Sequence, residues 1–159
     1  MKRYLPKLPL FILALGAVIR ILGTGSSALW YDESATLFRT GIPFLTLWVE
    51  RSENSGDLLL ELIERPLMAL SHNLWLFRLP SMLAGLVSLW LVWKLMRRLD
   101  FSLPQQVLAS TFVAFLPGLI WIAQDARVYG ILALLILAAL WFALESRWLG
   151  LLAVCGLMV

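Results

Sequence analysis

Two adjacent carboxylates, Asp32 and Glu33, follow a Trp-Tyr pair and form the sharpest chemical feature of the sequence. An accessible carboxylate can act as a general base toward a hydroxyl or an amine, or can bind a divalent cation. The alternative is structural. Asp32 could cap a helix that runs from Glu33 to Arg39, and the two aromatic residues before it could belong to a membrane-surface belt. The dipeptide by itself leaves both interpretations open.

A second polar cluster, Gln124-Asp125-Ala126-Arg127-Val128-Tyr129, interrupts a long apolar stretch much further along the chain. Charges beside a membrane are costly unless they face water, a partner or a ligand. The cluster could therefore belong to a binding site. It could equally be a polar hairpin in which Asp125 pairs with Arg127 and the arginine reaches toward the interface.

The composition around these clusters is typical of an integral membrane protein. Of the 159 residues, 61% are hydrophobic and 14% are charged, and the mean hydropathy is +0.86. A soluble domain of this composition would have too little polar surface to cover itself. The net charge is +3, but the Lys and Arg residues stand at the ends of apolar runs, which favours membrane topology over nucleic-acid binding.

Apolar runs predict an all-α, polytopic membrane helix bundle. The runs cover residues 8–22, 79–96, 103–123, 128–144 and 148–159. A span needs roughly 20 apolar residues, so the first four are long enough to cross and the last, about a dozen residues, is not. Pro117 and Gly118 predict a kink or close packing in the third run. We expect one transmembrane unit over 1–159 with about four full spans and an incomplete fifth.

The basic residues predict the orientation of these spans. Three of them precede the first run, and Arg97 and Arg98 follow the second. The positive-inside rule assigns both groups to the cytoplasm, so we expect a multi-pass cell-membrane protein with a cytoplasmic amino terminus and an extracytoplasmic first loop. The third span then brings the 124–129 cluster to the same outer face as Asp32.

The first outer loop, residues 23–77, is acidic and is predicted to contain a helix over 57–70. Leucines fill one face of that helix and carboxylates the other, which is typical of a helix lying in the membrane interface. The carboxylates are Asp57, Glu61 and Glu64. Pro66 should kink or restart the helix.

Several stretches occur in an order that resembles a known family. They are Arg20, Leu-Trp-Tyr-Asp-Glu-Ser-Ala at 29–35, Phe-Arg-Leu-Pro-Ser-Met-Leu-Ala-Gly at 77–85, the basic pair at 97–98, and Pro117 followed by the 124–129 cluster. In order and spacing they resemble the amino-terminal part of GT-C membrane glycosyltransferases. The most similar branch contains the protein O-mannosyltransferases and lipid A aminoarabinose transferase. The resemblance covers about residues 20–144 and implies the first part of a larger GT-C transmembrane domain.

The resemblance implies an enzyme that transfers a sugar from a polyprenyl-phosphate donor to a protein, lipid or glycan acceptor at the extracytoplasmic face, with inversion at the anomeric carbon. The implied catalytic residues are Asp32, Glu33 and Asp125. Asp32 would be the base or a ligand to a divalent cation, Mg²⁺ or Mn²⁺. The implied ligands of the donor phosphate are Arg127, Tyr129 and Arg78. A planar guanidinium can bind phosphate oxygens bidentately, which suits Arg127 to this role.

Family members are several times longer, so this chain by itself is expected to lack a complete active cavity. The alternative function is a small non-catalytic membrane protein, either an assembly partner or a remnant of the family. Arg20 and Arg78 are expected near the outer ends of their helices, where they would contact a lipid phosphate or reach toward the interface.

Overall fold

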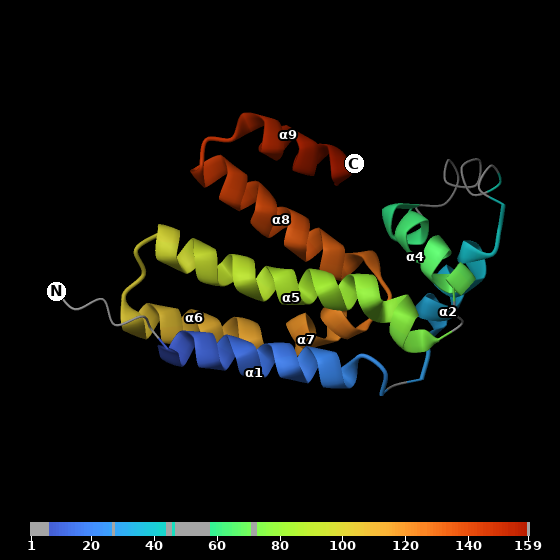
Figure 1. Ribbon diagram of the computed structural model, residues 1–159, viewed down its shortest axis with the longest axis horizontal. Coiled ribbons are helices and arrows are strands. Elements are labelled where there is room, and N and C mark those ends of the chain that lie inside the picture. Colours follow the sequence, from blue (N-terminus) through green and yellow to red (C-terminus); the bar gives the residue numbers. More distant parts are fainter. Residues whose placement is uncertain (1–6, 27, 44–45, 47–57, 71–72, 159) are drawn as a thin grey trace.

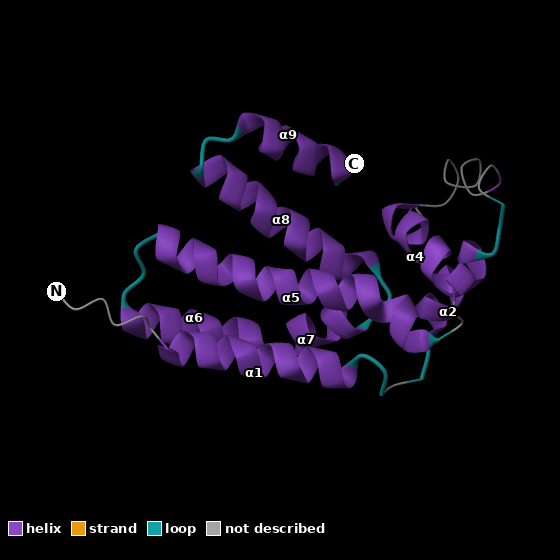
Figure 2. Ribbon diagram, in the orientation of Figure 1, coloured by secondary structure: helices purple, strands orange, loops and turns teal. Residues whose placement is uncertain are grey.

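In the computed structural model every described element is a helix, which confirms the all-α prediction (Figures 1 and 2). The structure describes residues 7–26, 28–43, 46, 58–70 and 73–158. The helices are α1 (Lys7–Gly23), α2 (Tyr31–Thr40), α4 (Leu58–Leu70), α5 (Leu74–Arg98), α6 (Leu103–Phe115), α7 (Pro117–Gln124), α8 (Val128–Leu144) and α9 (Trp148–Leu157).

Helix α5 is the centre of a bundle in which α1, α5, the α6–α7 pair and α8 alternate in direction (Figure 1). It packs against α1, α6 and α7 on one side and against α8 on the other, and α9 folds back along α8. Leu13, Leu89 and Met96 form an apolar core where α1 and α5 meet. The short helices α2 and α4 lie together at one end of the bundle.

One described helix, α5, is long and apolar enough to cross a membrane by itself. The α6–α7 pair could form a second span, bent by 49° at its break, whereas α8 and α9 are apolar but shorter. The predicted runs correspond closely to these helices, and α8 coincides with the fourth run. The four-span topology and its orientation stay predictions.

Helix α5 begins at Leu74, earlier than the apolar run predicts. The side chain of Asn73 caps the helix, because its Oδ1 accepts a hydrogen bond of 2.9 Å from the backbone N–H of Trp75. The extra turn extends α5 toward α4, and it puts Arg78 in the second turn of the helix.

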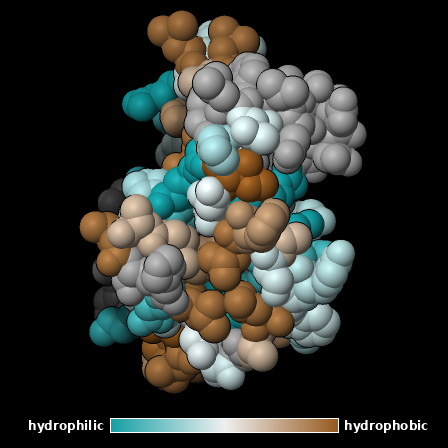
Figure 3. Space-filling view, turned by 90° about the vertical axis from the view of Figure 1, so that its right-hand side faces the viewer, coloured by the Kyte–Doolittle hydropathy of each residue, from teal (hydrophilic) through white to brown (hydrophobic). Residues whose placement is uncertain are grey.

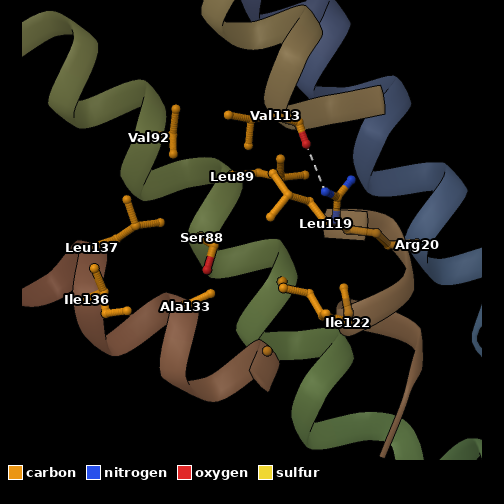
Figure 4. Close-up of a pocket in the computed structure, with 13 residues that line it drawn as sticks. Arg20, Ser88, Leu89, Val92, Val113, Leu119, Ile122, Ala133, Ile136 and Leu137 are labelled. Atoms are coloured by element: carbon orange, nitrogen blue, oxygen red, sulfur yellow. Dashed lines mark hydrogen bonds between the residues drawn. The ribbon is translucent and has the colours of Figure 1, made fainter. Parts of the chain in front are cut away.

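The predicted kink at Pro117 is a break between α6 and α7. Proline has no N–H, so the carbonyl of Val113 loses its helical partner. The buried guanidinium of Arg20 donates instead to Val113 O at 2.9 Å and to Ala114 O at 3.1 Å (Figure 4). The expectation that Arg20 reaches the interface or a lipid phosphate is wrong, because its side chain satisfies the end of α6 and is only 2% exposed.

Small residues let the bundle helices approach closely. A Cβ added to Gly16 would lie 2.8 Å from the Cβ of Ala114, and one added to Gly85 would lie 2.5 Å from the Cβ of Ala123. Such contacts at α1–α6 and α5–α7 crossings leave no room for larger side chains. Glycine and alanine at these positions are typical of membrane helix packing.

Helix α4 departs from its predicted pattern. It runs through Pro66 without restarting, and Glu64 is fully buried whereas Leu62 is 44% exposed. The predicted solvent-facing position of Glu64 is wrong, because α4 packs against α2 and α5 through the face that carries this carboxylate. Asp57 and the side chain of Glu61 lie outside the described residues. The position of α4 relative to a membrane stays a prediction.

Candidate functional site

The two polar clusters of the sequence meet at the end of the bundle that carries α2 and α4 (Figure 1). Asp32 and Glu33 lie in the first turn of α2, and residues 125–127 form the connection between α7 and α8. The two segments touch directly, since the backbone N–H of Ala126 donates to Glu33 Oε1 at 2.8 Å. Residues distant in sequence therefore share one end of the fold, as predicted.

Glu33 forms a buried ion pair with Arg78 of α5. Arg78 Nε lies 2.8 Å from Glu33 Oε1 and Arg78 Nη2 lies 2.6 Å from Oε2, and both side chains are at most 1% exposed. The same guanidinium also donates to Thr24 O at 3.1 Å and to Ala28 O at 3.2 Å. The pair thus joins α5, the start of α2 and the segment after α1. The expectation that Arg78 reaches the interface is wrong.

The same carboxylate of Glu33 also begins helix α2. Its Oε2 accepts a hydrogen bond of 3.2 Å from the backbone N–H of Trp30, the residue before the helix. A negative charge in the first turn is favoured by the helix dipole. The structural alternative assigned this capping role to Asp32. The prediction that Asp32 caps the helix is wrong, because α2 begins at Tyr31 and the Glu33 side chain accepts the hydrogen bond from the backbone N–H of Trp30.

Asp125 lies against Glu33, and the two carboxyl groups interact through a hydrogen bond and through charge. Burial by itself would raise the pKa of Glu33, but hydrogen bonds from Arg78, Ala126, Asp125 and Trp30 lower it to about 2. Burial, together with the hydrogen bond to Glu33 and its negative charge, raises the pKa of Asp125 to about 7. The charges of Arg127 and Arg78 only partly oppose this rise. Asp125 therefore keeps its proton up to about pH 7, whereas Glu33 is ionised above about pH 2.

Asp32, in contrast to Glu33 and Asp125, has an accessible carboxylate. Its side chain is 67% exposed, and its Oδ2 lies 4.0 Å from Nη2 of Arg127. The Arg127 guanidinium lies 5.7 Å from the centre of the Tyr129 ring, within the range of a cation–π contact. Ser81 of α5 fixes the backbone here, since its hydroxyl donates to Arg127 O at 3.0 Å. A carboxylate and a cation are thus held side by side at the surface.

The described side chains around Asp32 do not form a cation site. Within the parts of the chain that the structure describes, no group of three or more His, Cys, Asp or Glu residues could hold a metal ion. Divalent cations such as Mg²⁺ need about six oxygen ligands, several of which are usually charged. Glu33 forms an ion pair with Arg78, and the positive charge of Arg127 lies next to Asp32, which disfavours a cation there.

Comparison with known proteins adds no relative. No family model, curated protein or solved structure matches this chain.

Exposed aromatic rings lie at the same end of the bundle as Asp32. Trp30 packs edge-on against Trp121, with ring centres 6.2 Å apart and an interplanar angle of 65°. Trp30, Tyr31 and Tyr129 are 60%, 88% and 48% exposed. Seen from this end, polar and apolar surfaces lie next to one another (Figure 3). A rim of this kind can contact the apolar face of a sugar ring while a carboxylate and an arginine contact its polar groups.

A separate cavity of about 280 Å³ lies deeper, among α5, α7 and α8 (Figure 4). Its lining is apolar except for Arg20 and Ser88, and none of the predicted site residues lines it. Leu119 and Ile122 of α7 and Ile136 and Leu137 of α8 face it (Figure 4). The cavity therefore does not belong to the Asp32 site.

Sequence reasoning missed the roles of Thr24, Ser81 and the backbone of Ala126. The signal that could have found part of this network is Arg78, a charged residue inside a long apolar helix. Such a residue must find a buried partner or reach water. The nearby acidic dipeptide was the available partner, but nothing in the sequence chose Glu33 over Asp32.

Proposed function

We propose that this chain is part of a membrane glycosyltransferase of the GT-C type, which transfers a sugar from a lipid-phosphate donor to an acceptor at the extracytoplasmic face. The observation that carries the proposal is the exposed carboxylate of Asp32 beside the guanidinium of Arg127, 4.0 Å apart. The two groups that such a transfer needs, a base and a phosphate ligand, stand together.

The proposed membrane position has its own support. The outward faces of the bundle helices carry large apolar side chains, among them Phe11 at 61%, Leu108 at 73% and Leu152 at 68% exposure. An exposed apolar area of this extent is more stable in contact with lipid than in contact with water. We propose a multi-pass arrangement with the Lys7 end in the cytoplasm and the Asp32 end outside, consistent with the basic residues near Arg97.

The proposed reaction is a single displacement. Asp32 takes the proton of the acceptor hydroxyl or amine, whose oxygen or nitrogen forms a bond to the anomeric carbon. The bond between that carbon and the phosphate oxygen breaks, and its electron pair leaves with the polyprenyl phosphate. Arg127 stabilises the negative charge that develops on this leaving group. Attack opposite the leaving group inverts the anomeric carbon.

The remaining polar residues position this pair and do not touch the substrate in the proposal. Arg78 already donates to Glu33 and to two backbone carbonyls, so the phosphate role implied for it by the resemblance is given to Arg127 and Tyr129. Glu33 and Asp125 hold α2 against the 125–127 connection. Asp32 gains its position from Glu33, its neighbour in the first turn of α2.

The test is Asp32→Asn in the native gene product, with Asp100→Asn as the matched control at the opposite end of the bundle. Loss of a general base lowers transfer by about 10²–10⁴-fold. We expect this loss for Asp32→Asn at unchanged helicity and membrane integration, and near-normal transfer for the control. Equal activity of both variants in a lipid-phosphate-sugar assay would refute the proposed role of Asp32.

The second candidate is a non-catalytic membrane protein. It is favoured by one observation: two of the three carboxylates implied to be catalytic, Glu33 and Asp125, have structural contacts that explain their presence. Under this alternative Asp32→Asn and Arg127→Gln change neither donor binding nor transfer. Binding of a polyprenyl-phosphate sugar that Arg127→Gln weakens and Asp32→Asn does not would favour the enzyme.

A further inference from the structure

A second charged surface lies at the end of the bundle opposite the Asp32 site. A hollow of about 420 Å³ is formed there by the last turns of α5 and the end of α8. It is lined by Trp93, Lys94, Arg97, Arg98 and Trp141, and we call it the basic hollow. Three cations and two indole rings in one shallow depression form an unusual concentration of charge on an apolar helix.

The cations of the basic hollow are held in place by aromatic rings. The Lys94 ammonium lies 4.9 Å from the ring centre of Trp90 and 5.5 Å from that of Trp141. The Arg97 guanidinium lies 5.0 Å from the ring centre of Trp93. Cation–π contacts at these distances stabilise an ordered position of the charge without neutralising it. Lys94 also joins α5 to α8, since Trp141 belongs to α8.

Only part of the positive charge is neutralised. Arg98 pairs with Glu145, with 2.9 Å between Arg98 Nε and Glu145 Oε1. Among the residues that the structure describes, no carboxylate forms an ion pair with Lys94 or Arg97. The basic hollow therefore retains two positive charges, which an anion can neutralise.

The surface beside the basic hollow is apolar and continues along the two helices that form it. Trp90 on α5 is 53% exposed, and Leu140 on α8 is 46% exposed. An anion with a long apolar tail could bury its charge in the hollow and its tail along this flank. A phospholipid combines these features, and tryptophan with lysine or arginine is typical of the level at which headgroups lie.

We propose that the basic hollow binds the phosphodiester headgroup of an anionic membrane phospholipid, whose acyl chains lie against α5 and α8. Lys94 and Arg97 bind the phosphate oxygens, and Trp93 and Trp141 contact the glycerol region. The proposal rests on the membrane placement suggested above and is independent of glycosyl transfer. It assigns the cytoplasmic end of the bundle to lipid recognition.

The test compares lipid binding by the full chain in nanodiscs of phosphatidylcholine with and without phosphatidylglycerol. Lys94→Gln/Arg97→Gln should weaken retention of phosphatidylglycerol, measured by native mass spectrometry, by about tenfold or more, since each basic residue contributes to anionic lipid binding. The matched control is Lys7→Gln/Arg147→Gln, which removes the same charge from the same end outside the hollow. This control variant should retain phosphatidylglycerol as well as the unchanged protein does.

Two further arms make the result specific. Lys94→Arg/Arg97→Lys keeps both charges and should retain the lipid, whereas soluble glycerophosphate at the same concentration should not displace it. Equal loss in the glutamine and control variants, or displacement by glycerophosphate, would overturn the proposal. Failure of the chain to enter nanodiscs would overturn both the lipid site and the membrane placement. Glycosyl transfer is tested separately, by the activity of Asp32→Asn.

Discussion

At the scale of single residues, the Glu33–Arg78 pair explains how two full charges are accommodated where there is no water. The carboxylate of Glu33 accepts from Arg78 and from the N–H groups of Trp30 and Ala126, and the guanidinium donates to two further carbonyls. A buried ion pair offsets its desolvation only when its remaining donors and acceptors are satisfied in this way.

This geometry predicts an asymmetry between single and double substitutions. Arg78→Met leaves a buried anion without its partner and should destabilise the fold by about 3–5 kcal/mol. Arg78→Met/Glu33→Met removes both charges and should cost clearly less than the single change. Urea unfolding in detergent, followed by circular dichroism, measures the difference. A double variant less stable than Arg78→Met would contradict the importance of the pair.

The protonated Asp125 predicts how stability depends on pH. Its pKa is about 7 in the folded protein against an ordinary 3.8, so the folded state binds a proton that the unfolded chain releases between these values. The free energy of unfolding therefore falls as pH rises from about 4 to about 7. Glu33 acts in the opposite sense at lower pH, since its pKa of about 2 lies below the ordinary 4.5 and its contribution is lost on acidification.

Asp125→Asn tests this assignment, because an amide resembles the protonated carboxyl and does not titrate. We expect the thermal midpoint of this variant to vary less between pH 5 and pH 7 than that of the unchanged protein. Asp100→Asn, an exposed change at the opposite end, should leave the pH profile as it was. Identical profiles for the unchanged protein and Asp125→Asn would show that another group titrates.

At the scale of elements, the break between α6 and α7 depends on α1. Pro117 releases the Val113 carbonyl, and Arg20 of α1 supplies the missing donor. The C-terminal end of α6 carries partial negative charge, which the guanidinium also offsets. The bent span is thus a joint property of two helices.

A double-mutant cycle tests this dependence. Arg20→Met leaves two buried carbonyls without donors and should cost about 1–3 kcal/mol for each. In a Pro117→Ala background the backbone N–H at 117 can bond to Val113 O, so Arg20→Met should cost less there. Chemical unfolding of the four proteins gives the coupling energy. A coupling near zero would mean that Arg20 stabilises the bundle by some other contact.

At the scale of the whole molecule, both signs of charge occur at the Asp32 end of the bundle, whereas basic side chains are in excess at the opposite end. Asp32 and the 125–127 connection lie at one end, and Lys94, Arg97 and Arg147 lie at the other (Figure 1). In a membrane, the positive-inside rule predicts that the end with the basic excess faces the cytoplasm. We propose glycosyl transfer at the Asp32 end and binding of an anionic lipid at the end that carries Lys94 and Arg97.

Cysteine labelling tests the orientation. In a background where Cys155 is replaced by Ser, a cysteine at exposed Ser34 should react with a membrane-impermeant thiol reagent in intact cells, and one at exposed Ser102 should not. Permeabilised cells should label at both positions. Labelling of Ser102 with no reaction at Ser34 would invert the protein and remove the basis for a lipid-linked donor at Asp32.

The sequence by itself determined the helices and the convergence of the two polar clusters. Apolar runs of sufficient length define helices by local chemistry, and the fourth run reproduces the bounds of α8. Proline at position 117 determined the break, because a missing N–H acts locally. The alternation of helices then brought Asp32 and Arg127 to one end, as the charge pattern predicted.

Only the tertiary structure decided which carboxylate is buried and which is accessible. Asp32 and Glu33 are adjacent and chemically similar, so no local rule separates them. Their side chains point about 100° apart around a helix, and the placement of α2 directs Glu33 toward Arg78 of α5 and leaves Asp32 exposed. The partners of Arg20 were likewise undetermined, because they lie on a helix about ninety residues away. Burial and pairing depend on contacts between distant segments, which one-dimensional periodicity does not contain.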